Sequence, residues 1–119
     1  MCLVLVVDDE ELARVSMAAI LAMLGHEIIQ ARDGLEALLI YRMKQLKIHL
    51  VLMDIAMPRM DGIAAAKVMR AVNPAARIIL VSGDAAQVPP EVEPSGFLLK
   101  PFRSKALCAI VQQALEGVG

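Results

Sequence analysis

Five polar residues in this chain stand at the ends of apolar runs that have the length of buried β-strands. They are Asp8 and Asp9 after residues 2–7, Asp54 after 49–53, Ser82 after 77–81 and Lys100 after 96–99. In an open sheet of parallel strands the carboxyl ends of the strands meet at one edge, and such sheets bind their ligands there. The sequence therefore predicts one site that combines three carboxylates, a hydroxyl and an ammonium group.

The chemistry of such a site follows from its charges. Carboxylates that are packed together repel one another unless a cation joins them, and oxygen ligands open to water and phosphate suit Mg²⁺ or Mn²⁺ better than zinc. Asp8 and Asp9 are therefore the candidate metal ligands. A carboxylate beside such a metal can attack a phosphoryl group and form an aspartyl phosphate. In this hypothesis Asp54 is the nucleophile, Lys100 and the metal neutralise the phosphoryl oxygens, and Ser82 binds them.

Each of these residues also has an ordinary structural explanation. Taken alone, Asp54 is better explained as a residue that starts a turn or caps the next helix. Asp9 could equally be a helix-capping acid, Ser82 a strand-end cap, and Lys100 a surface ammonium group. All of these explanations together require several unrelated coincidences at one edge of the sheet. The convergence of the strand ends therefore favours the chemical interpretation.

The remaining segments supply the elements that position this edge. A further strand is expected at residues 26–31, and apolar residues recur at helical spacing over 10–24, 35–42, 63–72 and 104–115. Strands that alternate with helices predict a doubly wound parallel sheet with right-handed crossovers. The 119 residues predict a single α/β domain over residues 1–119. Asp61 and Gly62 open the third helix, and Ser104 is the candidate cap of the last.

The first of these helices has more apolar residues than one face can hold. We assign to its core-facing stripe Leu12, Val15, Ala19, Ile20, Met23 and Leu24. The apolar residues left off this stripe are Met17, Ala18, Leu21 and Ala22, and they are candidates for a partner-binding surface.

The segment between Ser82 and Lys100 is too short and too rich in proline for a normal helix. It has 17 residues, and Pro89, Pro90 and Pro94 exclude a long helix from it. Residues 85–88 have room for one helical turn. The sequence therefore predicts a shortened or irregular fourth helix.

Composition and charge exclude several classes of function. The net charge is −1 without a basic stripe, which argues against direct binding of nucleic acid. The longest apolar run, residues 17–24, is far shorter than the roughly 20 residues that span a bilayer, and no signal-peptide pattern is present. We therefore expect a cytoplasmic domain that is not in a membrane. Cys2 and Cys108 are expected to be reduced core or surface thiols rather than a disulfide, and His26 and His49 to be surface or edge residues.

Several motifs together resemble the receiver domain of two-component response regulators. They are Val-Val-Asp-Asp-Glu (6–10), Met-Asp-Ile-Ala-Met-Pro-Arg-Met-Asp-Gly (53–62), the strand end at Ser82 and Phe-Leu-Leu-Lys-Pro-Phe (97–102). The resemblance spans nearly the whole chain in the right order. It implies a flavodoxin-like fold with strand order 2-1-3-4-5. It also implies that a histidine kinase or a histidine phosphotransfer protein donates a phosphoryl group to Asp54.

The resemblance further implies roles for individual residues. Mg²⁺ would be held by Asp9, Asp54 and the backbone carbonyl of Ala56, with Asp8 acting mainly through water. The domain would catalyse its own phosphorylation and a slow hydrolysis of the product. The peptide bond before Pro101 is expected to be cis.

A switch is implied in the same way. Ser82 would move toward the phosphoryl group, and Phe97 would turn inward into the space that Ser82 leaves. Three features depart from the usual family pattern: the short segment after Ser82, Gly83 in place of a small alanine, and Phe rather than Tyr at position 97. The family's usual output and dimer surface therefore does not carry over directly. The output partner and the oligomeric state stay open, with phosphorylation-dependent dimerisation among the outcomes.

Three other functions compete with this interpretation. A phosphorylation-independent interaction module on the same fold would not need the acid cluster. An aspartyl phosphatase typically has a second acid two residues after its nucleophile, where this chain has Ala56. A flavin-binding module would need a phosphate-binding loop rich in Gly, Ser or Thr after the first strand, and none follows it here.

Overall fold

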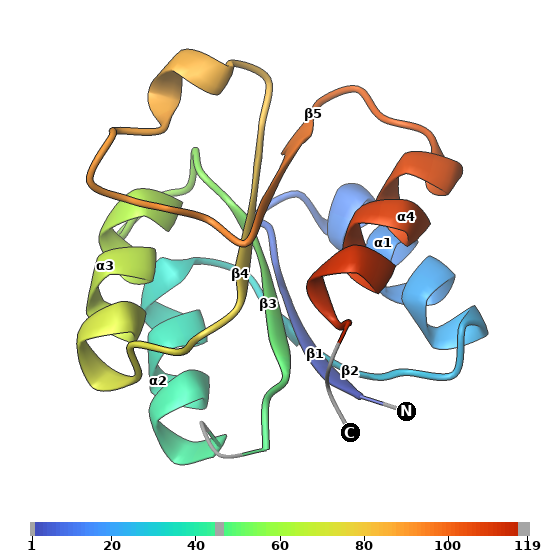
Figure 1. Cartoon of the computed structure of the whole chain (residues 1–119), viewed down its shortest axis with the longest axis horizontal. Helices are drawn as coiled ribbons and strands as arrows, with labels where there is room; N and C mark the ends of the chain where they lie inside the picture. Colours follow the sequence, from blue (N-terminus) through green and yellow to red (C-terminus); the bar gives the residue numbers. More distant parts are fainter. Residues whose placement is uncertain (1, 45–46, 117–119) are drawn as a thin grey trace.

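A computed structural model describes residues 2–44 and 47–116 as a sheet with helices on both faces (Figure 1). The strands are β1 (Leu3–Val7), β2 (Glu27–Ala31), β3 (Leu50–Asp54), β4 (Ile78–Ser82) and β5 (Gly96–Leu99). The helices are α1 (Glu11–Met23), α2 (Gly34–Lys44), α3 (Gly62–Val72) and α4 (Ser104–Ala114), and a single 3-10 turn, η1, covers Ala85–Gln87. The predicted alternation of strands and helices is confirmed.

All neighbouring strands are parallel, and their order is β2-β1-β3-β4-β5. This confirms the flavodoxin-like fold with strand order 2-1-3-4-5. Asp54 pairs with Val81, and Ser82 pairs with Leu99. Asp54 and Ser82 are thus the last residues of their strands rather than the first residues after them. The ladder extends this far because Ile55 N still donates to Val81 O at 3.0 Å.

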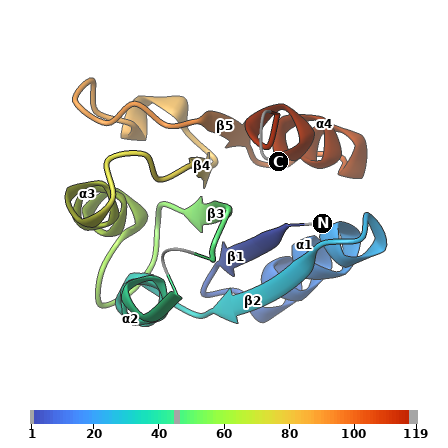
Figure 2. The same ribbon diagram turned by 60° about the horizontal axis from the view of Figure 1, so that its bottom comes forward.

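Two hydrophobic cores hold the layers together. Helices α1 and α4 cover one face of the sheet, and α2 and α3 cover the other (Figures 1 and 2). Every residue of β3 and β4 is buried, as expected for central strands between two helical layers. The two cores receive alternate residues of these strands: Val51 and Met53 face the α2–α3 side, and Leu50 and Leu52 face the α1–α4 side.

The predicted core face of α1 is wrong. The helix buries Arg14, Met17, Ala18 and Leu21, whereas Leu12 and Met23 are 85% and 87% exposed. The buried set has the spacing of one helical face, but it begins with a charged residue, so a search for apolar residues misses it. Arg14 tolerates burial because its guanidinium donates to Asp8 O at 3.1 Å and to Gln30 Oε1 at 3.0 Å.

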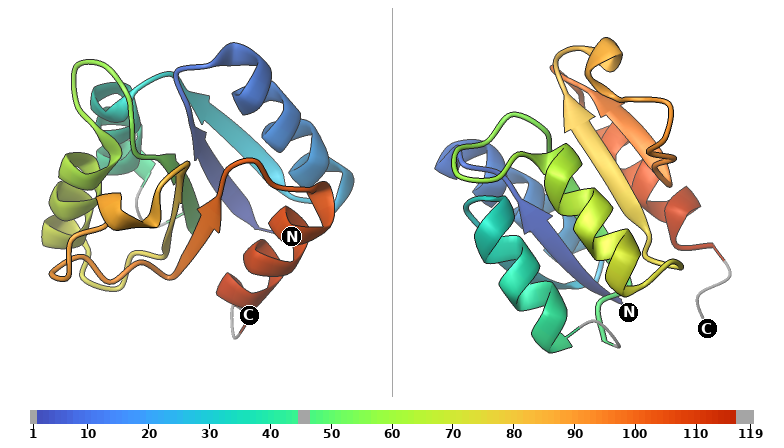
Figure 3. Two further views of the ribbon diagram at one scale, coloured as in Figure 1. Left: turned by 90° about the horizontal axis from the view of Figure 1, so that it is seen from above. Right: turned by 90° about the vertical axis from the view of Figure 1, so that its left-hand side faces the viewer.

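The segment between β4 and β5, where the sequence predicted a shortened or irregular helix, contains only the η1 turn. The predicted irregularity of this segment is confirmed. Asp84 caps the turn, because its Oδ1 accepts a hydrogen bond from Ala86 N at 2.9 Å. Residues 88–95 then run past α3 to β5 (Figure 3). Lys67 pairs with Glu91 at 3.3 Å, and Arg70 donates to Glu93 O at 2.9 Å. These two contacts attach the irregular segment to α3.

The N-caps predicted for α3 and α4 differ in their outcome. Asp61 is the N-cap of α3 and accepts from Ala64 N at 2.8 Å, but the cap position of α4 is Arg103, so the prediction for Ser104 is wrong. Ser104 fails as a cap because it already lies within the helix.

Other expectations for single residues hold. Both cysteines are free, and the Lys100–Pro101 bond is cis. His26 and His49 flank the start of β1 and accept hydrogen bonds through Nδ1 from Cys2 N and Leu3 N, at 3.3 and 2.9 Å. None of the helices in the described ranges is both long and apolar enough to cross a bilayer.

Candidate functional site

The structure brings the five predicted residues to one edge of the sheet. Asp8 and Asp9 follow β1, Asp54 and Ser82 end β3 and β4, and Lys100 follows β5. Lys100 Nζ lies 3.4 Å from Asp8 Oδ2 and 3.3 Å from Asp54 Oδ1. A carboxylate oxygen from each of the three aspartates lies within 4.8 Å of the others. A small open pocket at this edge is lined by Asp9, Asp54, Ala56, Ser82 and Lys100, together with Glu10, Gly83, Asp84 and Gln87.

The carboxylates differ in their access to solvent. Asp8 is fully buried, Asp54 is 5% exposed, and Asp9 is open to solvent. Asp8 accepts a hydrogen bond from Glu10 N at 2.9 Å in addition to its ion pair with Lys100. Asp54 has only the lysine as a charged partner among the described residues. Two buried acids thus share one ammonium group, and the third acid faces the solvent.

This environment changes the acid strength of the central residues. Burial, followed by the negative charges of Asp8 and Asp9, raises the pKa of Asp54 to about 6, against the opposing effect of Lys100. Burial works against the charge of Lys100, but the two aspartates in contact with it outweigh burial and raise its pKa. The site therefore has an excess of negative charge that a cation would relieve.

The donors at this edge fit a hard divalent cation. They are carboxylate oxygens, three of them close enough to share one ion, with one side open to solvent. Mg²⁺ prefers such oxygen ligands and keeps several waters, which an open pocket allows. The chemistry of the donor set thus suits Mg²⁺ and does not suit zinc, for which a His or Cys would be expected.

The loop after Asp54 folds back tightly against the strand. Gly62 lies so close to Asp54 that a Cβ atom there would come within 2.2 Å of Asp54 O, and Gly62 N donates to Ile55 O at 2.8 Å. Any larger residue at position 62 would displace the backbone of Asp54. The Asp-Gly pair at 61–62 thus both starts α3 and fixes the position of the candidate nucleophile.

An ion pair that the sequence analysis missed closes the same loop. Arg59 has a positive φ of 64° and donates to Asp33 Oδ2 through Nε at 2.8 Å. Asp33 also accepts from Glu36 N at 2.9 Å. Although burial alone would raise the pKa of Asp33, the hydrogen bonds from Glu36 and Arg59 hold it below its usual value. The Arg-Asp-Gly turn at 32–34 was the only sequence signal for this contact, and its partner lies 26 residues away.

A second missed residue, Gln87, contacts the predicted hydroxyl. Ser82 Oγ pairs with Gln87 Oε1, which comes from the η1 turn. Phe97 is partly buried, packs against the α2–α3 core and pairs in register with Leu80 of β4. No spacing rule could have placed Gln87 here, because the turn has no periodic pattern.

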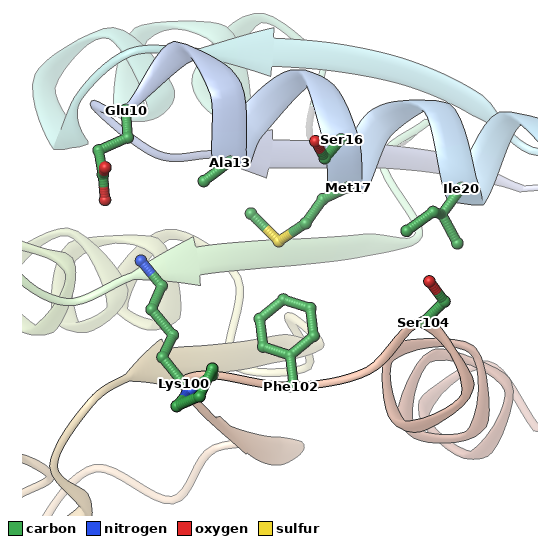
Figure 4. Close-up of a pocket in the computed structure, with 9 residues that line it drawn as sticks. Glu10, Ala13, Ser16, Met17, Ile20, Lys100, Phe102 and Ser104 are labelled. Atoms are coloured by element: carbon green, nitrogen blue, oxygen red, sulfur yellow. The ribbon is translucent and has the colours of Figure 1, made fainter.

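An apolar groove lies beside the charged site, between α1 and the segment before α4 (Figure 4). Met17 and Phe102 face each other across it, and the Lys100 side chain runs along its end toward the carboxyl edge of the sheet. The groove has only Glu10 and Lys100 as charged lining residues. Of the five predicted site residues only Lys100 lines this groove, whereas Asp9, Asp54 and Ser82 line the polar pocket.

The fold and the site together define a class: a flavodoxin-like domain with an acidic cluster and a lysine at the carboxyl edge of its sheet. A family model described as the response regulator receiver domain matches residues 4–112. The chain belongs to this family, and the resemblance seen in the sequence is confirmed. It is thus a receiver domain of two-component signalling.

Individual relatives agree with this assignment. Chemotaxis protein CheY of Thermotoga maritima is 38% identical over 105 residues, which cover 84% of this chain and 86% of that protein. Sensor kinase CckA of Brucella abortus is 35% identical over 117 residues, or 95% of this chain, but this region is only 12% of the kinase. Among solved structures, the CheX–CheY–BeF3–Mg complex of Borrelia burgdorferi superposes with a TM-score of 0.88 at 29% identity, covering 96% of this chain and 89% of that one.

Proposed function

We propose that this chain, as one receiver domain over residues 1–119, accepts a phosphoryl group on Asp54 from a phosphohistidine in a Mg²⁺-dependent reaction. The modified domain then presents a changed surface to a partner. The observation that carries the proposal is the contact of Lys100 Nζ with Asp54 Oδ1, 3.3 Å apart, within a cluster of three carboxylates. This arrangement provides a nucleophile, a fixed cation and a place for a metal at one strand end.

Asp54 would supply the nucleophilic oxygen. It attacks phosphorus, a P–O bond forms, and the P–N bond to the donor imidazole breaks; the imidazole keeps the electron pair and takes up a proton. With a pKa of about 6, most Asp54 side chains are ionised at pH 7 and can attack. Lys100 then balances charge on the transferred oxygens. Attack of water on phosphorus later restores the carboxylate and releases phosphate.

The acidic cluster would hold the metal. Asp9, Asp54 and the backbone carbonyl of Ala56 are the proposed ligands, with Asp8 acting through water. When bound, Mg²⁺ supplies positive charge that offsets the carboxylates and the phosphoryl oxygens. Asp8 has a second task, because its ion pair at 3.4 Å keeps Lys100 directed at the site.

The switch would use Ser82 and Phe97. The hydroxyl of Ser82 donates to a phosphoryl oxygen, and Phe97 turns inward. Their placement supports this proposal, because Phe97 is the cross-strand neighbour of Leu80, two residues before Ser82 in β4. A movement of Ser82 at the end of β4 can therefore reach Phe97 directly through the pairing of β4 with β5.

The donor would be a histidine kinase or a histidine phosphotransfer protein, as expected for two-component signalling. One relative of this domain lies within a sensor kinase. We place the reaction in the cytoplasm. The proposed output is an interaction with a partner or an attached domain that distinguishes the two states.

The test is incubation with Mg²⁺ and acetyl phosphate, followed by intact-mass measurement. We expect the wild type to gain one phosphoryl group, Asp54→Asn to gain none, and Glu27→Gln, which changes an exposed acid on β2, to match the wild type. Chelation of Mg²⁺ should abolish the gain. If Asp54→Asn is modified like the wild type, Asp54 is not the acceptor and the proposal fails. If no variant is modified, the domain is a phosphorylation-independent interaction module instead.

A further inference from the structure

The hydroxyl of Ser82 is engaged by its own downstream turn. Ser82 is 3% exposed, and the partners of its hydroxyl in the described part of the chain are Gln87 and Asp84. Oγ contacts Gln87 Oε1, lies 3.2 Å from Asp84 O and accepts from Asp84 N at 3.1 Å. The hydroxyl of the proposed switch residue is therefore engaged within its own turn.

Gln87 lies beside the proposed phosphorylation site. It is the last residue of η1, and its backbone N donates to Asp84 O at 3.2 Å, which closes the turn. Its side chain lines the same pocket as Asp54, Ser82 and Lys100. The amide thus reaches from the turn that replaces a longer helix back to the reactive edge of the sheet.

A serine hydroxyl has a single proton to donate. Whether that proton is given to Gln87 Oε1 or to Asp84 O, it is not available to a phosphoryl oxygen. We propose that Gln87 is a latch residue that holds Ser82 in its unphosphorylated orientation and competes with the phosphoryl group for this hydroxyl. The inference deepens the proposed function and rests on it. Gln87 is a positioning residue in this proposal, because it acts through Ser82.

Loss of the Gln87–Ser82 contact would affect η1 first and then the segment that follows it. Once Ser82 donates to the phosphoryl group, Gln87 loses its anchor, and η1 is left with its backbone bonds and the Asp84 cap. The next residues, 88–95, are attached to α3 through Glu91 and the carbonyl of Glu93. Movement of Gln87 therefore alters a surface made by this segment and α3.

The experiment titrates beryllium fluoride, a phosphoryl mimic, into the Mg²⁺-loaded full chain and follows the amide signals of Ser82 and Gly83 by NMR. In the wild type, beryllium fluoride must displace the Gln87–Ser82 contact, which costs roughly the free energy of one hydrogen bond. Gln87→Ala lacks this contact and should therefore bind beryllium fluoride about fivefold more tightly than wild type. Gln87→Leu, which keeps the bulk but lacks the acceptor, should behave in the same way. The matched control is Gln112→Ala, on an exposed position of α4, and should match wild type.

Two further readouts separate a latch from a merely structural role. Without beryllium fluoride, the Ser82 and Gly83 signals of Gln87→Ala should shift toward their bound positions, because the competing state loses its stabilisation. In a Ser82→Ala background the effect of Gln87→Ala on binding should vanish. A structural defect would instead weaken binding and broaden signals across the domain.

The outcomes are distinguishable. If the wild type does not bind beryllium fluoride, the proposed function and the latch both fail. If the wild type binds and Gln87→Ala matches Gln112→Ala, only the latch fails. Weaker binding by Gln87→Ala would also overturn the latch: with sharp signals it would mean that Gln87 contacts the phosphoryl group itself, and with signals broadened across the domain it would mean a structural defect.

Discussion

Asp54 is the residue whose charge the fold controls most directly. It is 5% exposed, it contacts a lysine, and a glycine packs against its backbone, so neither its position nor its surroundings adapt easily. Keeping an ionised carboxylate there beside Asp8 costs folding free energy. The proposed reaction requires the same negative charge on Asp54, so a cost in stability accompanies it.

The first prediction concerns the pH dependence of this cost. The folded-state pKa of Asp54 is raised from 3.8 to about 6, so between these values the folded protein binds more protons than the unfolded chain, and stability falls as pH rises through this window. Asp54→Asn removes this titration. In the absence of Mg²⁺ at pH 7.5, the variant should therefore be more stable than wild type, by at most roughly 3 kcal/mol.

The measurement is urea unfolding at a series of pH values. The difference between wild type and Asp54→Asn should disappear below about pH 3, where the Asp54 carboxyl group is protonated in both the folded and the unfolded state, and should shrink when Mg²⁺ is added at pH 7.5. Glu27→Gln, at an exposed position, provides the matched control. A wild type that gains stability relative to Asp54→Asn between pH 4 and pH 6 would contradict the expected sign.

At the scale of elements, α1 has apolar residues on all sides, so its contacts with the sheet determine which face is buried. Met17 is 2% exposed and packs in the α1–α4 core, while Met23, six residues later, is 87% exposed. The choice is fixed by the fit of Met17 and Leu21 over β1 and β3 and by the polar partners of Arg14. The exposed apolar face is made instead by Leu12, Val15, Met23 and Leu24.

The second prediction compares two methionines of this helix. Met17→Ala should destabilise the domain by about 2–4 kcal/mol, because it removes a large buried side chain from the α1–α4 core. Met23→Ala should change the free energy of unfolding by less than about 0.5 kcal/mol, because its side chain is in solvent. Urea unfolding of both variants provides the measurement. Equal destabilisation by the two would mean that α1 is rotated relative to the arrangement described here.

The difference between what could and could not be predicted follows from the physics of each element. The strands were predictable because β3 and β4 are buried on both faces and are therefore apolar throughout. Asp8, Asp54, Ser82 and Lys100 came with them, since parallel strands bring their carboxyl ends together. The face of α1 was not predictable from apolar periodicity, because a buried Arg14 opens the stripe.

Contacts between loops were beyond the sequence for another reason. The Arg59–Asp33 pair and the Gln87–Ser82 contact depend on where two irregular backbones come to lie. Neither backbone has a period that could be recognised. The prolines of the segment after Ser82 predicted the absence of a long helix. They did not predict that the side chain of Gln87, in its single turn, would contact Ser82.

At the scale of the whole molecule, the sheet is covered unevenly. Helices α1 and α4 cover one face, and α2 and α3 cover most of the other, but the connection from β4 to β5 has only η1 and an irregular segment (Figures 1 and 3). Strand β5 pairs with β4 on one side only and is one of the two edge strands of the sheet. The stability of the domain is therefore expected to be lowest around this connection.

The third prediction tests this expectation by native-state hydrogen exchange. Amides of Val81 and Leu52, in buried central strands, should exchange only through global unfolding. Amides of Gln87, Val88 and Val92, which bond within short turns, should exchange through local opening at a much lower free energy. Protection of the turn amides equal to that of the central strands would show that the connection unfolds with the rest of the domain.

The helix-poor connection also matters for how such a domain could be altered by insertion. It is attached to α3 by one side-chain ion pair and one hydrogen bond to a backbone carbonyl, both toward its distal end, while its proximal end is fixed at Ser82. Added residues between these anchors, around Pro89 and Pro90, would extend into solvent without disturbing the register of β4 and β5. The connection is therefore a natural place to graft a reporter peptide or a binding loop whose exposure would follow the state of Asp54.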